Sequence, residues 1–238
     1  MRLNKFIASA SSLSRRGADD AITRNRVMVN GQVATPGMDV GPSDVVTLDD
    51  QRITPDVRVV TILFNKPVGY IVSRDGQGGR TIYDLVPAEY QHLNPVGRLD
   101  KDSSGLLLLT NDGQLAHELT HPSKQKQKVY QVTLDTPLTP DDLAKLQQGI
   151  KLEDGPSQLT VTPSRARQGG PNTPQDLSIP PTPTQHDGFT YEVTMHEGRN
   201  RQIRRTFDAL GHSVVQLHRI QFGAYMLGST NPGEHRLI

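Results

Sequence analysis

The chain has 238 residues, a length that suits a small module followed by a main domain of about 150 to 200 residues. It contains no cysteine, which excludes disulfide frameworks, thiolate metal sites and thiol nucleophiles. The formal net charge of +1 favours no particular partner, so the distribution of charge matters more than its sum. No signal peptide or long apolar run is recognisable, and we expect a soluble cytoplasmic protein that does not enter a membrane.

The first thirty residues are distinctly basic. They contain six basic residues and two acidic ones, a formal charge of +4, which is typical of a surface that binds polyanions. The basic residues are Arg2, Lys5, Arg15, Arg16, Arg24 and Arg26.

A small module is predicted over residues 1–50. Apolar residues at i, i+3, i+4 and i+7 predict a helix over residues 3–10, and Ser14 is a suitable cap for a second helix. Valines on both sides of Asn30-Gly31 predict a hairpin with a tight primed turn. A strand over residues 45–48 completes the module.

Residues 51–58 are polar and include Pro55, so we expect a linker there and a second domain over residues 59–238. This domain opens with a buried strand at residues 59–64. Thr139 and Pro140 predict the start of a helix that ends at Gly149.

Residues 128–134 alternate in polarity and predict a strand with Tyr130, Val132 and Leu134 on one face. Tyr130 is then either a core residue with a hydrated hydroxyl or an aromatic ring that faces a base in a cleft. Its spacing is compatible with both.

Residues 163–188 have a different composition, with six prolines, three glycines and almost no large apolar side chains. Such a composition is typical of a flexible insertion. Because strand-like segments flank it at residues 159–161 and 189–195, we expect an extended hairpin loop.

The most informative segment places carboxylates directly before a run of four leucines, residues 106–109. Glycines on both sides of this run favour a strand, and Asn111-Asp112-Gly113 predicts a turn after it. Asp100 therefore lies where the chain passes from a loop into the core. A carboxylate there can act as a nucleophile or general base, or can simply form turn hydrogen bonds.

Four arginines fall within seven residues at 199–205, at the start of a helix with an apolar stripe of Ile203, Phe207 and Leu210. Cations at this end oppose the helix dipole, and Arg201 with Arg205 forms a like-charge pair that costs roughly 0.2 to 0.5 kcal/mol. A solvated basic face neutralised by nearby acids is one interpretation. Contact with phosphates or a buried carboxylate is the other.

His117-Glu118-Leu119-Thr120-His121 matches the H-E-x-x-H pattern of zinc metalloproteases. Pro122 disfavours a helical conformation at His121, and no motif for a third ligand follows. We therefore expect a short helix that ends in a turn, and no metal site.

Together these motifs resemble the RsuA/RluB/RluE/RluF family of ribosomal RNA pseudouridine synthases. Gly97-Arg98-Leu99-Asp100 through Gly113 is similar to the catalytic motif of the family. Lys128 to Val132 and Glu197 to Arg205 resemble its second and third motifs. Residues 14–16 and 27–31 resemble the N-terminal RNA-binding module that this family shares with a small-subunit ribosomal protein. The resemblance covers nearly the whole chain.

The resemblance implies an α+β fold in which a small RNA-binding module of two helices and a hairpin precedes a catalytic domain with a mixed, largely antiparallel sheet and flanking helices. It implies isomerisation of a uridine in ribosomal RNA to pseudouridine without a metal or an organic cofactor. Asp100 would be the catalytic carboxylate, Tyr130 would stack on the uracil, and Arg204 would pair with Asp100.

Further roles follow from the same resemblance. Ile203 would pack against the base, and Arg98 would help to occupy the space of the displaced nucleotide. Phosphates would be held by the remaining arginines of the third motif and of the N-terminal module, namely Arg199, Arg201, Arg205, Arg15, Arg16, Arg24 and Arg26.

The expected partner is ribosomal RNA within a precursor particle, and we expect a monomer. The Arg199-Asn200-Arg201 form of the third motif is more like that of large-subunit members, which favours 23S over 16S RNA. A 16S enzyme and a non-catalytic RNA-binding assembly factor are the alternatives.

Overall fold

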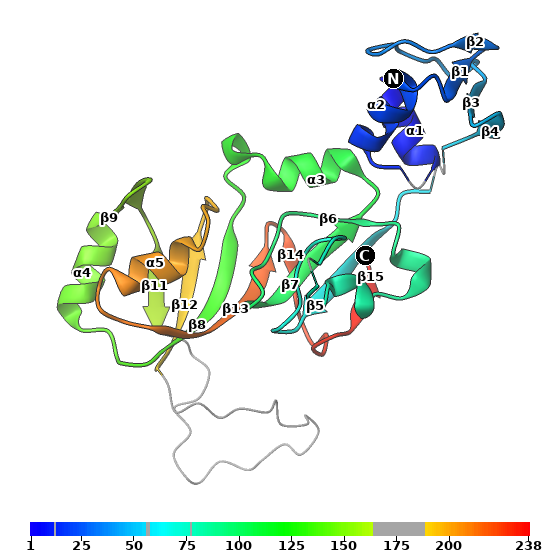
Figure 1. Cartoon of the computed structure of the whole chain (residues 1–238). Helices are drawn as coiled ribbons and strands as arrows, with labels where there is room; N and C mark the ends of the chain where they lie inside the picture. The colour runs from blue at the N-terminus through cyan, green and yellow to red at the C-terminus, as the bar shows by residue number, and fades with distance from the viewer. Residues whose placement is uncertain (12, 56–57, 77, 164–188) are drawn as a thin grey trace. The chain divides into compact units, whose positions relative to one another are not determined.

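The computed structural model describes residues 1–11, 13–55, 58–76, 78–163 and 189–238. The chain forms two compact units, Met1–Val60 and Thr61–Ile238 (Figure 1). Among the described residues, none of the helices combines the length and the apolar character needed to cross a bilayer.

The first unit is a pair of helices packed on a small antiparallel sheet. The helices are α1 (Leu3–Ala10) and α2 (Arg15–Thr23), and the strands are β1 (Val27–Val29), β2 (Gln32–Val33), β3 (Val46–Leu48) and β4 (Gln51–Ile53), in the order β2-β1-β3-β4. Leu3 and Ile7 of α1 pack with Ala18 and Ile22 of α2 and with Val27 of β1 in one apolar core. The predicted module of two helices and a hairpin is confirmed.

Local signals in the sequence account for these elements. The Ser14 hydroxyl accepts a hydrogen bond from the Gly17 amide at 3.1 Å and so caps α2. Asn30 and Gly31 both have positive φ, 52° and 80°, as a primed two-residue turn requires.

One boundary differs from the expectation. Gln51–Ile53, predicted to begin the linker, forms β4 and pairs with β3. The polar composition of this segment is explained by its place at the edge of the sheet, where Gln51 and Arg52 are exposed.

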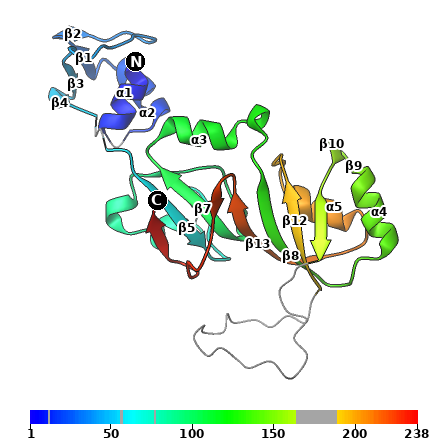
Figure 2. The same ribbon diagram turned by 180° about the vertical axis from the view of Figure 1, so that it is seen from behind.

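The second unit is built on one mixed sheet, shown from two sides in Figures 1 and 2. Its order is β11-β12-β8-β13-β7-β5-β15, with β14 paired to β13 and β6 to β7. Neighbouring strands are antiparallel except β7 and β13, which are parallel. The strands are β5 (Thr61–Lys66), β6 (Asn94–Pro95), β7 (Ser104–Thr110), β8 (Lys128–Leu134), β11 (Thr160–Pro163), β12 (Phe189–Met195), β13 (Val214–Phe222), β14 (Tyr225–Met226) and β15 (His235–Leu237).

Three α-helices and a small hairpin flank this sheet. The helices are α3 (Gly113–Thr120), α4 (Pro140–Gln148) and α5 (Gln202–Asp208), the hairpin strands are β9 (Ile150–Leu152) and β10 (Gly155–Ser157), and short 3-10 turns lie at Ile82–Asp84, Ala88–Tyr90 and Pro122–Lys124. Helix α3 contacts β7, α4 contacts β11, and α5 contacts β13. The expected α+β class and the largely antiparallel sheet are confirmed.

The leucine run forms the centre of the sheet. Leu106 to Leu109 lie in β7 and are fully buried on both faces of the strand. Strand β5 pairs with β7 along its whole length and is buried throughout, which explains why both strands are apolar without alternation. The strand predicted at residues 59–64 is found two residues later.

Gly105 permits the close approach of β7 and β13. Its φ is 104°, and a Cβ atom there would collide with the backbone of Arg219. This approach brings the chain that follows Asp100 directly against β13.

The strands predicted around the proline-rich insertion pair with each other as a hairpin, from Thr160 with Thr194 to Pro163 with Tyr191. The rest of the predicted insertion, 164–188, lies outside the described residues.

Candidate active site

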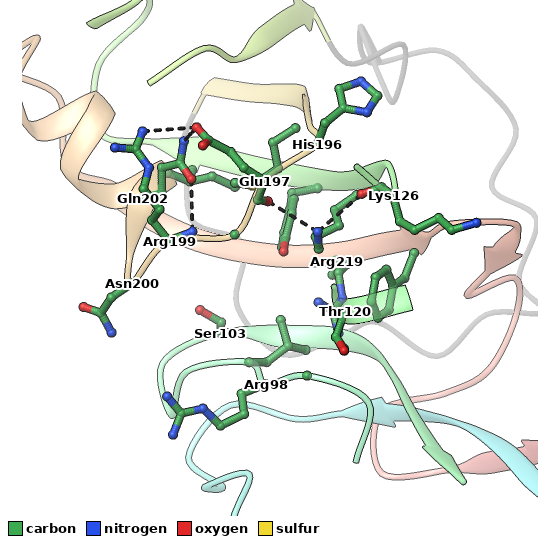
Figure 3. Close-up of a pocket in the computed structure, with 18 of the residues that line it drawn as sticks. Arg98, Ser103, Thr120, Lys126, His196, Glu197, Arg199, Asn200, Gln202 and Arg219 are labelled. Carbon is green, nitrogen blue, oxygen red and sulfur yellow. Dashed lines mark hydrogen bonds and ion pairs between the residues drawn. The ribbon is translucent and has the colours of Figure 1, made fainter. Parts of the chain in front are cut away.

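A cleft of about 460 Å³ opens where the three motifs meet (Figure 3). The loop before β7 contributes Asp100, β8 contributes Tyr130, and the start of α5 contributes Ile203. Strand β13 supplies Leu217 and Arg219 to the same cleft. Segments that lie far apart in sequence, from Asp100 to Arg219, therefore line one cavity.

Asp100 lies on a loop that a buried lysine holds in place. The Lys66 side chain is fully buried at the end of β5, and its ammonium donates to the carbonyls of Pro67 (3.0 Å), Asp100 (3.0 Å) and Ser103 (2.7 Å). Burial lowers the pKa of Lys66 to about 8, although Asp100 and Asp102 oppose this. The Asp100 side chain itself remains 39% exposed and lines the cleft.

Two arginines of the third motif, Arg201 and Arg204, lie closer to Asp102 than to Asp100. Arg201 donates two hydrogen bonds to the Asp102 carboxylate, at 3.0 and 2.9 Å, and Arg204 Nε lies 3.3 Å from it. Arg204 also donates to the carbonyl of Asp102 at 2.8 Å. The expected pairing of Arg204 with Asp100 is therefore corrected, because the aspartate two residues later lies closer to that guanidinium.

Asp100 nevertheless lies in a positive environment. Its carboxylate oxygen is 3.8 Å from Arg201 Nη1. Burial raises the pKa of Asp102, but the hydrogen bond from Arg201 and the charges of Arg204 and Arg201 outweigh it, so this pKa lies below its ordinary value. Two carboxylates and two guanidiniums thus form one charged group at the mouth of the cleft.

The other two arginines are engaged by the β9–β10 hairpin. Arg199 lies 2.9 Å from an Asp154 carboxylate oxygen and donates to the carbonyls of Gly155 and Pro156. Arg205 donates to both Asp154 oxygens, at 3.0 and 2.8 Å. The hydrogen bond from Arg205 lowers the pKa of Asp154, with the charges of both arginines adding to the effect. Asp154 is thus a shared partner of Arg199 and Arg205 that sequence reasoning missed, and the expected phosphate contacts of these arginines stay a prediction.

Part of the wall of the cleft is apolar. Tyr130 is 7% exposed and Ile203 is 4% exposed, and both line the cavity. The Tyr130 hydroxyl forms no hydrogen bond with any residue that the structure describes. Arg98 is exposed at the same cleft, with no ion pair in the described part of the chain (Figure 3). Flat apolar surfaces without many polar contacts suit a planar base.

The H-E-x-x-H segment has the predicted local geometry. His117 lies in α3, but His121 follows its end in an extended conformation, φ −67° and ψ 128°, and its Nδ1 contacts the Ser123 hydroxyl at 2.7 Å. The described residues contain no cluster of three side chains suited to hold a metal ion. The helix thus ends before His121, as expected from Pro122, although the imidazole rings of His117 and His121 have centroids 4.7 Å apart.

Lys66, Lys128 and Arg219 were not identified from the sequence. Lys66 had one usable signal, because it is a charged residue at the end of an apolar run. Lys128 and Arg219 lie on the neighbouring strands β8 and β13, a proximity that only the pairing of these strands creates.

In the N-terminal unit, two of the four arginines predicted to contact RNA form ion pairs with aspartates, and the other two are exposed. Arg24 lies 3.1 Å from Asp20, and Arg26 forms a bidentate pair with Asp49. Arg15 and Arg16 of α2 are exposed and have no ion pair within the described ranges.

Comparison with known proteins agrees with this architecture. Residues 60–209 match the family model described as RNA pseudouridylate synthase, and residues 1–46 match the S4 domain. The chain is 36% identical to Ribosomal large subunit pseudouridine synthase B of Bacillus subtilis, over 99% of this chain and 91% of that protein. It is 33% identical to Ribosomal small subunit pseudouridine synthase A of Salmonella typhimurium, over 99% and 95%.

A solved structure titled "Crystal structure of pseudouridylate synthase" superposes with a TM-score of 0.65 at 31% identity, covering 100% of this chain and 96% of that one. The match thus extends over both units and includes every motif that lines the cleft. The chain belongs to the S4-domain-containing family of RNA pseudouridine synthases, of the RsuA/RluB type.

Proposed function

We propose that this enzyme isomerises a specific uridine of 23S ribosomal RNA to pseudouridine, with Asp100 as the reacting carboxylate. The observation that carries the proposal is the position of Asp100 at a cleft that Tyr130 and Ile203 also line, 3.8 Å from the Arg201 guanidinium. A uridine within folded RNA reaches such a cleft only when it is flipped out of its helix.

The roles of the other residues follow from their positions. Tyr130 stacks on the uracil, and Ile203 packs against it from α5, so that the detached base can turn between two apolar surfaces. Arg98 fills the space that the flipped nucleotide leaves. Arg201 and Arg204, which the Asp102 carboxylate binds, place positive charge beside Asp100.

The isomerisation breaks the bond between C1′ and N1 and forms one between C1′ and C5. The ring then loses the proton at C5 and gains one at N1, so that the product has the same composition as the uridine. Three routes use an ionised Asp100: attack on C1′, attack on the uracil ring, and removal of a sugar proton to give a glycal. Each needs a carboxylate that can reach the nucleotide, and the Asp100 side chain lines the cleft with 39% of its surface exposed.

The choice of 23S RNA rests on the Arg199-Asn200-Arg201 form of the third motif. The identities of 36% to a large-subunit enzyme and 33% to a small-subunit enzyme are similar, so they support a ribosomal RNA substrate in general. Exposed Arg15 and Arg16 of α2 supply phosphate contacts, and affinity for RNA then falls with salt.

The direct test incubates purified enzyme with separate 16S and 23S transcripts and maps pseudouridine by mass spectrometry. We expect one modified position in 23S RNA with wild type and none with Asp100→Asn. Asp208→Asn is the matched control, because Asp208 is exposed, lies outside the cleft and has no ion pair among the described residues. Modification of 16S RNA alone would reject the choice of substrate, and an active Asp100→Asn enzyme would reject the role of Asp100.

A further inference from the structure

Two cations, Arg219 and Lys128, line the cleft without an ion pair to any residue that the structure describes. Arg219 is only 2% exposed, and its Nε donates to the Leu106 carbonyl at 2.7 Å. Its Nη1 and Nη2 have no hydrogen-bond acceptor among the residues that the structure describes, and Nη2 is buried. A buried guanidinium with unused donors is costly unless a ligand supplies the acceptors.

Lys128 lies beside this guanidinium. Its Nζ makes only long hydrogen bonds, 3.3 Å to the Lys126 carbonyl and 3.4 Å to the Glu197 carbonyl. Burial lowers the pKa of Lys128 and the charge of Arg219 lowers it further, whereas the charge of Glu197 opposes both effects. Glu197 also lines the cleft, but neither cation lies within 4.0 Å of a carboxylate in the described part of the chain.

The Phe222 ring makes cation–π contacts with both cations. The Arg219 guanidinium carbon lies 4.7 Å from the centre of the Phe222 ring, and Lys128 Nζ lies 5.5 Å from it. All three residues line the cleft together with Asp100, and Figure 3 shows Arg219 there. The aromatic ring stabilises the cations without neutralising them.

The electron flow of the proposed reaction requires a positive charge near the base. When the bond between C1′ and N1 breaks, its electron pair passes to the uracil, and the negative charge spreads to the carbonyl oxygens O2 and O4. If Asp100 instead attacks the uracil ring, negative charge again develops on a carbonyl oxygen. When C5 bonds to C1′, the uracil anion donates this electron pair to the new bond, so no other reactant is needed.

We propose that Arg219 and Lys128 form an electrophilic subsite that binds the acceptor edge of the uracil and stabilises the uracil anion during isomerisation. This inference rests on the proposed function and adds two catalytic residues to it. Its alternative is a binding site for a backbone phosphate, which would strengthen RNA binding without acting on the chemical step.

The first experiment measures single-turnover rates at saturating enzyme, together with the Kd for RNA, for wild type, Arg219→Gln and Lys128→Gln. We expect Arg219→Gln to lower the rate by roughly a hundredfold, as the loss of one oxyanion donor does, with Kd changed less than about threefold. Arg236→Gln is the matched control, because Arg236 is exposed and lies outside the cleft. A weakened Kd with a normal rate at saturation would overturn the proposal in favour of a phosphate site.

Two further measurements separate this role from a structural one. In RNA with 5-fluorouridine at the target position, the fluorine itself stabilises the anion, so Arg219→Gln should slow reaction of the base less than in normal RNA. An equal loss of rate on both RNAs would contradict anion stabilisation.

Binding of free bases tests the subsite without catalysis. Ligand-observed NMR at neutral pH compares 5-nitrouracil, which is an anion, with uracil, which is neutral. We expect wild type to prefer the anion and Arg219→Gln to lose that preference, whereas equal binding or no binding by wild type would overturn the subsite. If wild type prefers the anion but forms no pseudouridine in RNA, the proposed function fails while the anion subsite stands.

Discussion

Lys66 provides a quantitative test of how the Asp100 loop is held. In Lys66→Met, the carbonyls of Pro67, Asp100 and Ser103 lose a buried charged donor. An unsatisfied buried acceptor costs about 1 kcal/mol or more, so we expect the variant to lose a few kcal/mol of unfolding free energy at neutral pH. The rate of isomerisation should fall as well, because Asp100 is no longer fixed.

The pH dependence of this loss is the sharper signature. The pKa of Lys66 is about 8 in the folded chain and 10.5 in the unfolded chain. Between these values the unfolded chain binds more protons, so the contribution of Lys66 to stability rises with pH. From about pH 6.5 to about pH 9.5, these two pKa values predict that the difference between wild type and Lys66→Met grows by about 2 kcal/mol.

Urea unfolding of both proteins across this pH range measures the difference directly. Subtracting the unfolding free energy of the variant from that of wild type removes the contributions of the titratable groups that the two proteins share. A difference that stays constant with pH, or that shrinks as pH rises, would refute the account of a desolvated ammonium under the Asp100 loop.

The remaining predictions concern the groups around the cleft. Asp102→Asn releases two arginines and should lower the single-turnover rate about tenfold or more, while the unfolding free energy changes by less than about 1 kcal/mol. An unchanged rate would show that the pairing of Asp102 with these arginines does not contribute to the reaction. Tyr130→Phe keeps the ring and should retain activity, whereas Tyr130→Leu should lose most of it; equal rates would exclude stacking. Combined Arg15→Gln and Arg16→Gln should reduce the slope of log affinity against log salt by about 1.5 in filter binding, and an unchanged slope would exclude these phosphate contacts.

Local sequence signals predicted most of the fold. The Ser14 cap, the Asn30-Gly31 turn and the leucine run each specify their element through contacts with near neighbours, and the structure contains all three. The linker boundary was missed because an exposed edge strand such as β4 has the same polar composition as a loop.

The ion pairs of the site were harder to predict, because they depend on distances in the folded chain and not on separation in sequence. Asp100 and Asp102 are two residues apart, and no sequence pattern decides which of them Arg204 contacts. Asp154 lies about fifty residues from Arg205 in sequence, yet it binds that guanidinium through the position of the β9–β10 hairpin. Motif order identified the cleft, whereas the partners within it required the tertiary structure.

The most direct test of the central claim is a pseudouridine map of ribosomal RNA from cells that lack this chain, complemented with wild type or with Asp100→Asn at equal expression. The account predicts that one 23S position loses pseudouridine in the deletion, regains it with wild type and stays unmodified with Asp100→Asn. Restoration of that position by Asp100→Asn would contradict it.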